Sequence, residues 1–294
     1  MKMVQSYWSK PGKANSDDLF YRNASGWHDK KYNYMAWALS CLNLRKHYDQ
    51  VELVTDAEGK KLLIDKLELP YTAVHVGLES LDHYPDGLWA MGKMYAYSIQ
   101  DGPFLHVDGD VFIWQKFDET IEKAPLAVQQ LEVDFAHYAE LMEQIRAHFD
   151  YVPPCLQKHC HGPLTAVNAG VMGGTDVAFF KEYTAEAFHF VDTNLHAVGK
   201  ISSLSLFNTM YEQLLFYVLA REQQVDVTCC YAGLGKRVDW LFALPGTAAT
   251  GQYTHATGGG KKDKILCTRL ENRLRSDYPE HYYLIMNKLR ALEI

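Results

Sequence analysis

The chain of 294 residues has no long apolar run, no excess of basic side chains and no paired cysteine motif. No stretch approaches the roughly 20 uninterrupted apolar residues that cross a bilayer, and the first residues lack the apolar core of a signal peptide. The formal net charge is −7, with 29 basic against 36 acidic side chains. Non-specific nucleic-acid binding needs a basic surface that displaces counterions, so this class is excluded. We expect a cytoplasmic protein without a transmembrane segment; peripheral membrane association stays open.

The six cysteines, at positions 41, 155, 160, 229, 230 and 267, include no Cys-x-x-Cys pair and have no regular spacing. This pattern favours reduced thiols over a disulfide framework. Cys155, His159, Cys160 and His161 crowd a proline-rich segment, but their spacing fits no common zinc pattern. We therefore favour a plain loop over a zinc site there.

The composition is typical of a globular protein, with 48% hydrophobic and 22% charged residues. Short apolar segments alternate with segments of helical periodicity. They predict strands near 3–8, 51–55, 71–76, 104–107, 126–130, 166–174 and 225–231, with helices at 57–67, 88–100, 134–149, 175–198 and 204–223, another ending near 48, and a long loop at 151–163. The alternation predicts a single α/β domain, whose mixed, mostly parallel sheet is covered by helices on both faces.

Two carboxylates follow the predicted strand at 104–107, one residue apart. Asp108 and Asp110 flank Gly109, which allows a backbone or ligand to approach closely. Neighbouring carboxylates repel each other unless a divalent cation lies between them or they share a proton. A common Asp-Gly turn is the alternative interpretation.

A second motif lies far downstream, at 255–262, where one histidine, three glycines and two lysines fall within eight residues. Consecutive glycines leave backbone N–H groups accessible to an anion, and lysines add charges suited to phosphate. His255 could complete a metal site with Asp108 and Asp110.

Together the two motifs resemble those of DxD glycosyltransferases of the GT-A fold, most closely glycosyltransferase family 8. His255, Gly258 and Lys261 match the spacing of the family's second motif, whereas Lys262-Asp263 stands where the family has Pro-Trp. The resemblance implies a GT-A-like, Rossmann-like domain over 1–264 and a C-terminal helical segment packed on it over 265–294.

The same resemblance implies a set of ligands. Asp108, Asp110 and His255 would hold Mn²⁺, with Mg²⁺ as the alternative. Gly258 and Lys261 would contact the diphosphate of a nucleotide-sugar donor.

Six further positions match the family in place or type. Ser6 and Tyr7 would meet the base and ribose, Lys93 the donor phosphates, and Asn168, Glu212 and Gln213 the donor sugar. Glu212 is one methylene longer than the family's acid. The alternatives are core packing for Tyr7, a surface position for Lys93, a buried asparagine satisfied by backbone, and an exposed Glu-Gln pair on an amphipathic helix.

The resulting hypothesis is a Mn²⁺-dependent, retaining hexosyltransferase of polysaccharide biosynthesis. It would act on a nucleoside diphosphate sugar, with a UDP-sugar favoured, and on a glycan, lipid-linked or protein acceptor. An inverting enzyme would need a base, for which Glu132 and Asp134 are candidates. A sugar-nucleotide pyrophosphorylase is a weaker alternative, because residues 5–12 lack its Gly-rich basic loop. A non-catalytic carbohydrate-binding protein would leave both motifs unexplained.

Overall fold

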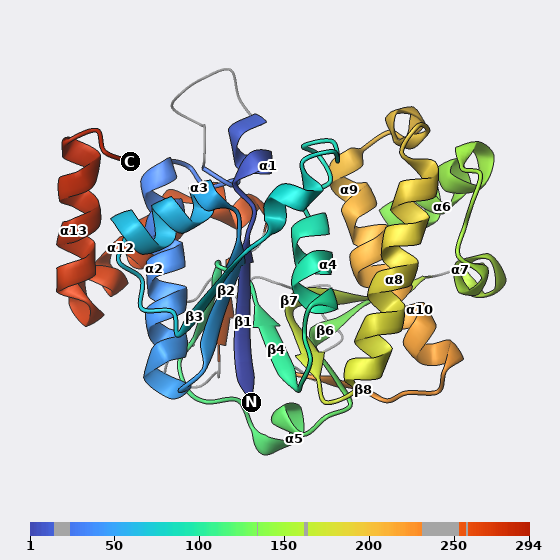
Figure 1. Ribbon diagram of the computed structural model, residues 1–294, viewed down its shortest axis with the longest axis horizontal. Helices are drawn as coiled ribbons and strands as arrows, with labels where there is room; N and C mark the ends of the chain where they lie inside the picture. The colour runs from blue at the N-terminus through green and yellow to red at the C-terminus, as the bar shows by residue number, and fades with distance from the viewer. Residues whose placement is uncertain (15–23, 134, 162–163, 231–252, 257) are drawn as a thin grey trace. The chain divides into compact units, whose positions relative to one another are not determined.

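The computed structural model describes residues 1–14, 24–133, 135–161, 164–230, 253–256 and 258–294. It is a mixed α/β fold with a seven-stranded, mostly parallel sheet in the order β3-β2-β1-β4-β7-β6-β8 (Figure 1). A separate two-stranded sheet pairs β5 with β9. The predicted α/β class with a mostly parallel sheet is confirmed. The described residues group into two compact units.

Unit 1 comprises the described residues of 1–80, 107–117 and 237–294. Its strands β1 (Lys2–Tyr7), β2 (Val51–Thr55) and β3 (Ala73–Val76) are parallel, while β5 (Val111–Ile113) and β9 (Tyr253–His255) are antiparallel. Its helices and turns are α1 (Ser9–Ala14), α2 (Lys30–His47), α3 (Ala57–Lys60), the π-helix η1 (Lys61–Lys66), the 3₁₀-helix η2 (Leu78–Leu81), the 3₁₀-helix η6 (Gly258–Lys262), α12 (Lys264–Asp277) and α13 (Pro279–Arg290).

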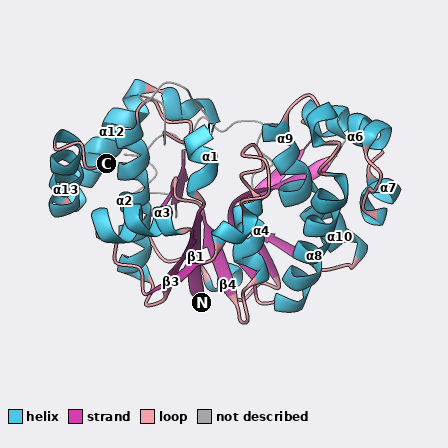
Figure 2. Ribbon diagram, turned by 45° about the horizontal axis from the view of Figure 1, so that its top comes forward, coloured by secondary structure: helices cyan, strands magenta, loops and turns pink. Residues whose placement is uncertain are grey.

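The core of unit 1 forms around α2. The side chain of Asp29 caps the first turn by accepting a hydrogen bond from the N–H of Lys31 at 2.7 Å. Leu39 of α2 shares a buried cluster with Leu270 of α12 and Ile285 of α13. The three helices lie side by side in both ribbon views (Figures 1 and 2). The predicted C-terminal helical segment therefore packs on α2.

Unit 2 comprises the described residues of 81–106 and 118–236. Strand β6 (Leu126–Val133) is antiparallel to β7 (Thr165–Gly174) and parallel to β8 (Val227–Cys229); β4 is Phe104–Val107. Its helices are α4 (Met91–Ser98), α5 (Glu119–Glu122), α6 (Ala136–His148), α7 (Pro154–His159), α8 (Val177–Asn194), the 3₁₀-helix η3 (Val198–Lys200), α9 (Leu204–Thr209), the π-helix η4 (Met210–Leu214) and α10 (Leu215–Glu222).

Aromatic side chains dominate the core of unit 2. Phe179 and Phe216 meet edge to face at 5.3 Å between ring centroids, as do Tyr183 and Phe216. Phe104 of β4 packs on Phe180 of α8 at 4.8 Å. Such pairs add about 0.5–1.5 kcal/mol each beyond the area they bury. This packing holds α8 and α10 together.

Two predicted segments differ from the structure. The predicted loop at 151–163 contains α7, because Pro154 occupies the first helical position, where its fixed φ and missing N–H favour helix initiation. The predicted helix at 204–223 is present as one continuous helical run over 204–222, but it contains the π-helix η4 between α9 and α10. Residues 134, 162 and 163 lie outside the described part of the chain. None of the helices described is long and apolar enough to span a membrane.

Candidate functional site

Asp108 and Asp110 lie in a tight turn between β4 and β5. The N–H of Val111 donates to the backbone oxygen of Asp108 at 3.0 Å and closes the turn. Ser40 of α2 donates through its hydroxyl to the backbone oxygens of Val111 at 2.7 Å and Asp108 at 3.3 Å. The Gln5 amide of β1 donates to the Ser40 hydroxyl at 2.9 Å. The backbone that carries the two carboxylates is therefore fixed by the core of unit 1.

Gly109, between the two aspartates, lies directly against Trp37 of α2. A Cβ atom at position 109 would come within 2.4 Å of the Trp37 indole. The indole also meets the Tyr7 ring edge to face, at 5.2 Å between centroids. Glycine is thus required here by close packing.

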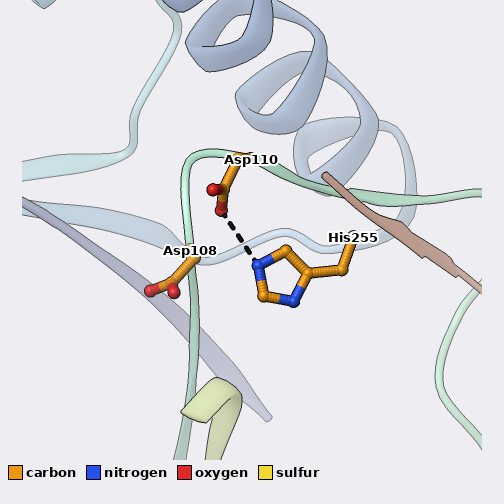
Figure 3. Close-up of side chains that lie close together, drawn as sticks. All are labelled: Asp108, Asp110 and His255. Carbon is orange, nitrogen blue, oxygen red and sulfur yellow. Dashed lines mark ion pairs between the residues drawn. The ribbon is translucent and has the colours of Figure 1, made fainter. Parts of the chain in front are cut away.

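His255 reaches the aspartates through the β5–β9 pairing. Val111 lies opposite His255, and the N–H of Ala256 donates to the backbone oxygen of Asp110 at 3.0 Å. The imidazole Nε2 is 3.4 Å from Asp110 Oδ1, as Figure 3 shows. One potential ligand atom from each of Asp108, Asp110 and His255 lies within 4.8 Å of the others. The aspartate pair and the histidine of the second motif, far apart in sequence, thus form one cluster.

Lys261 adds a positive charge to this cluster. Its ammonium is 2.6 Å from Asp110 Oδ2, and the two side chains are 19% and 15% exposed. Lys261 Nζ also lies 5.9 Å from the centroid of the Trp27 ring and donates to the backbone oxygen of Ser25 at 3.3 Å. Burial alone would raise the pKa of Asp110, but Lys261 and His255 outweigh it and hold the pKa well below its usual value. Asp110 is therefore ionised.

The donor set suits a divalent metal ion. Two carboxylates and one imidazole are the ligands that Mn²⁺ accepts, whereas Ca²⁺ prefers oxygen alone. Asp108, Asp110 and His255 form the only group of three or more potential metal ligands in the described ranges. Cys155, His159, Cys160 and His161 are not among the potential metal groups of the described residues, and Cys155 and His159 lie on α7 rather than in the plain loop that was expected there.

Gly258 begins η6, in which Lys261 lies. Its φ of 46° falls in the left-handed region, which glycine adopts without a Cβ clash. The carbonyl oxygen of Lys261 accepts from the N–H of His28 at 3.0 Å, which anchors η6 to the segment before α2. Residue 257 lies outside the described residues, so the motif is described over 255–256 and 258–262.

Unit 2 contains a buried ion pair between Lys93 of α4 and Glu212 of η4. The ammonium of Lys93 is 2.7 Å from Glu212 Oε1, with the side chains 12% and 0% exposed. The backbone oxygen of Glu212 accepts from the Tyr183 hydroxyl at 2.7 Å. Glu212 is therefore no exposed helix residue and Lys93 no free surface lysine, so both alternative interpretations were wrong.

A second polar group in unit 2 links β6, β7, α6 and η4. The Asn168 amide donates to Glu132 Oε1 at 2.9 Å, and its oxygen accepts from the N–H of Gly170 at 3.0 Å. The Tyr138 hydroxyl is 2.8 Å from Gln213 Oε1 and 3.3 Å from Glu132 Oε2. Burial, aided by Glu132, raises the pKa of Tyr138, so this hydroxyl stays protonated as a donor. The network orients Asn168 and Gln213.

The predicted site residues are divided between the units. Those in unit 1 are Ser6, Tyr7, Asp108, Asp110, His255, Gly258 and Lys261, and those in unit 2 are Lys93, Asn168, Glu212 and Gln213. Tyr7 is 7% exposed and belongs to the hydrophobic core, as its alternative interpretation held. Ser6 is half-buried on β1. Asp134, a candidate base, lies outside the described residues.

Sequence reasoning missed the residues that support the site. Trp37 and Ser40 lie three positions apart on α2, on its buried face, and Trp27 precedes the helix. Their helical spacing indicates burial, but it does not reveal that they meet the aspartate turn and Lys261. Likewise, the position of Tyr138 on α6 indicates burial but does not reveal its contact with Gln213.

Comparison with known proteins identifies a family without a known activity. Residues 1–288 match a family described as "Family of unknown function (DUF6734)", and the chain therefore belongs to it. No curated protein matches the chain significantly. The family description assigns no chemistry, so the geometry of the site must carry the argument for function.

Proposed function

We propose that this member of a family of unknown function is a metal-dependent glycosyltransferase. It would move a hexose from a nucleoside diphosphate sugar, with UDP favoured, to a hydroxyl of a glycan, lipid-linked sugar or protein. The observation that supports the proposal is the convergence of Asp108, Asp110 and His255, with Lys261 against Asp110. A retaining reaction and a cytoplasmic location are further predictions from the sequence.

The charges of the cluster suit the departure of a diphosphate. Negative charge grows on the leaving group as the bond to the sugar breaks, and a divalent ion held by Asp108, Asp110 and His255 would neutralise part of it. Lys261 supplies a fixed positive charge 2.6 Å from Asp110 Oδ2. The backbone anchoring of the aspartate turn keeps these groups in place, which lowers the reorganisation that the reaction requires.

The sugar-binding roles of Asn168, Glu212 and Gln213 stay predictions from the family resemblance. Their support lies within unit 2, where Lys93 pairs with Glu212 and Tyr138 holds Gln213. Buried polar groups held in this way are preorganised for hydrogen bonds, which distinguishes them from solvated surface residues. If the reaction is inverting, Glu132 is the described candidate for the base.

The test is turnover of a panel of nucleoside diphosphate sugars with Mn²⁺ and, separately, with a chelator. We expect one donor to be consumed only with the metal, and Lys261→Ala to lower kcat and kcat/KM together, by about 10²- to 10³-fold. Asp65→Asn is the control, since this exposed carboxylate pairs with Lys60. Metal-independent turnover at the wild-type rate by Asp110→Asn, or no donor binding at all with metal present, would refute the proposal.

A further inference from the structure

Unit 1 contains a second candidate binding site, a cavity of about 340 Å³ whose lining does not include the metal ligands. Its buried lining comes from the end of β1 and from α2, with Tyr7, Ser9 and Tyr34. Its basic lining is formed by Lys30, Lys61 and Lys66. The cavity therefore combines three ammonium groups with phenol rings and a hydroxyl.

The π-helix η1 explains why Lys61 and Lys66 line the same cavity. In an α-helix, residues five positions apart point about 140° away from each other. In η1 the N–H of Leu67 donates to the backbone oxygen of Leu62 at 2.9 Å, so the hydrogen bond spans five positions instead of four and the helix is wider. The wider turn brings both lysines to one face.

The three lysines differ from their neighbours in what they contact. Lys60 pairs with Asp65 at 3.0 Å and Lys31 with Glu271 at 3.1 Å. Among the residues that the structure describes, Lys30, Lys61 and Lys66 have no side-chain carboxylate as a partner. No Asp or Glu side chain of the described residues therefore pairs with them.

Two of these lysines already hold oxygen atoms of the C-terminal segment. Lys30 Nζ donates to the backbone oxygen of Ile294 at 3.1 Å, and Lys66 Nζ donates to that of Glu293. Figure 1 shows this end of the chain beside α2 and α3. The carboxylates of Glu58 and Glu293 also line the cavity, but Glu293 is 3.3 Å from Lys288, which offsets its charge. Among its side chains the lining thus has three ammonium groups and two carboxylates, one of which pairs with a lysine outside the cavity.

We propose that this cavity binds the phosphate group of a small molecule, at a site independent of the metal centre. Converging ammonium groups without side-chain carboxylate partners favour a multiply charged anion, and phosphate oxygens would replace the main-chain oxygens of residues 293 and 294 that Lys66 and Lys30 now hold. The volume is that of a small-ligand pocket, and the phenol rings of Tyr7 and Tyr34 offer contacts to an organic group.

Calorimetric titration with inorganic pyrophosphate, in a chelator and at about 0.15 M salt, tests the site. Charges separated by more than about 8 Å are screened under this condition. We expect Lys61→Gln and Lys66→Gln each to raise the Kd about five- to tenfold, as for loss of one charged hydrogen bond at a partly exposed site. Lys60→Gln is the matched control: it removes the same charge from the adjacent residue, which does not line the cavity, and should leave the Kd unchanged.

Three results would overturn the proposal. If Lys60→Gln raised the Kd for pyrophosphate as much as Lys61→Gln and Lys66→Gln do, the anion would be attracted to a basic surface and not bound in the cavity. Loss of binding in Lys261→Ala alone would assign pyrophosphate to the metal centre. Binding to vesicles that contain phosphatidic acid, without binding of pyrophosphate, would indicate a lipid surface as the ligand. Because the chelator removes divalent ions, failure of pyrophosphate to bind this cavity leaves the metal-dependent glycosyl transfer to its own test, the turnover of nucleotide sugars.

Discussion

The ion pair between Lys261 and Asp110 predicts a loss of stability in Asp110→Asn. On sequence grounds the substitution should be harmless, since it relieves repulsion between neighbouring carboxylates. In the structure, however, Asp110 accepts from an ammonium 2.6 Å away, and both side chains are less than one-fifth exposed. A charge-assisted hydrogen bond contributes about 1.5–3 kcal/mol, and the asparagine oxygen can replace part of it. We expect a net loss of about 1–2 kcal/mol.

The measurement is the free energy of unfolding by denaturant, with a chelator present so that metal binding does not contribute. A loss of this size lowers the Tm by about 2–6 °C in a chain of this length. The double variant Asp110→Asn/Lys261→Met should be more stable than Asp110→Asn alone, because it no longer leaves a partly buried ammonium without its carboxylate.

The pH dependence of the free energy of unfolding tests the direction of this stability change a second time. The pKa of Asp110 is lowered in the folded protein, so its stabilising contribution is complete above about 3.9, the usual value for aspartate, and is lost as pH falls through the lower folded value. The difference between wild type and Asp110→Asn should be constant near neutral pH and shrink below about 3.9. A variant that equals or exceeds the wild type in stability at pH 7 would refute the reasoning.

Other predictions follow from single contacts. Gly109→Ala should destabilise the protein by about 1–3 kcal/mol, because its Cβ would lie 2.4 Å from the Trp37 indole; an unchanged Tm would show that the turn can move away. Burial raises the pKa of Cys155 to about 12 and of Cys160 to about 11, so alkylation of both at pH 8 should be slower than that of a free thiol by about two orders of magnitude or more; rates equal to those of a model thiol would contradict this burial. Asn168→Ala should weaken binding of the intact nucleotide sugar by about 0.5–1.5 kcal/mol but leave the free nucleoside diphosphate unaffected. Calorimetric titration of both ligands measures the difference, and an equal loss in both would contradict the prediction.

Much of the fold follows from local patterns in the sequence. The apolar segments at 51–55 and 104–107 match β2 and β4, and Asp56 caps α3 by accepting from the N–H of Gly59 at 2.7 Å. The Asp-x-Asp and histidine motifs also predicted that Asp108, Asp110 and His255 come together, because two distant groups of potential ligands suit one cation. These features depend on residue type and short-range spacing.

What the sequence could not predict depends on helical irregularity and long-range packing. Glu212 looks like a solvated residue on an amphipathic helix, but the π-turn η4 changes the periodicity and the side chain is fully buried against Lys93. The lysines of the second cavity were missed for the same reason, since α-helical spacing places Lys61 and Lys66 on different faces. A π-turn, which widens the helix by one residue, leaves no distinct pattern in the local sequence.

The short pairing between β5 and β9 has a consequence for the order of folding. Only three residue pairs, from Val111–His255 to Ile113–Tyr253, join strands separated by almost half of the chain. Closing so long a loop has an entropic cost that local contacts do not offset, so such pairings tend to form late. The aspartate turn can form with its own neighbours in sequence and on α2, whereas His255 and Lys261 arrive only when nearly all of the chain is in place. During folding, affinity for a divalent ion should therefore appear at the final step, and metal binding would report completion of the native topology.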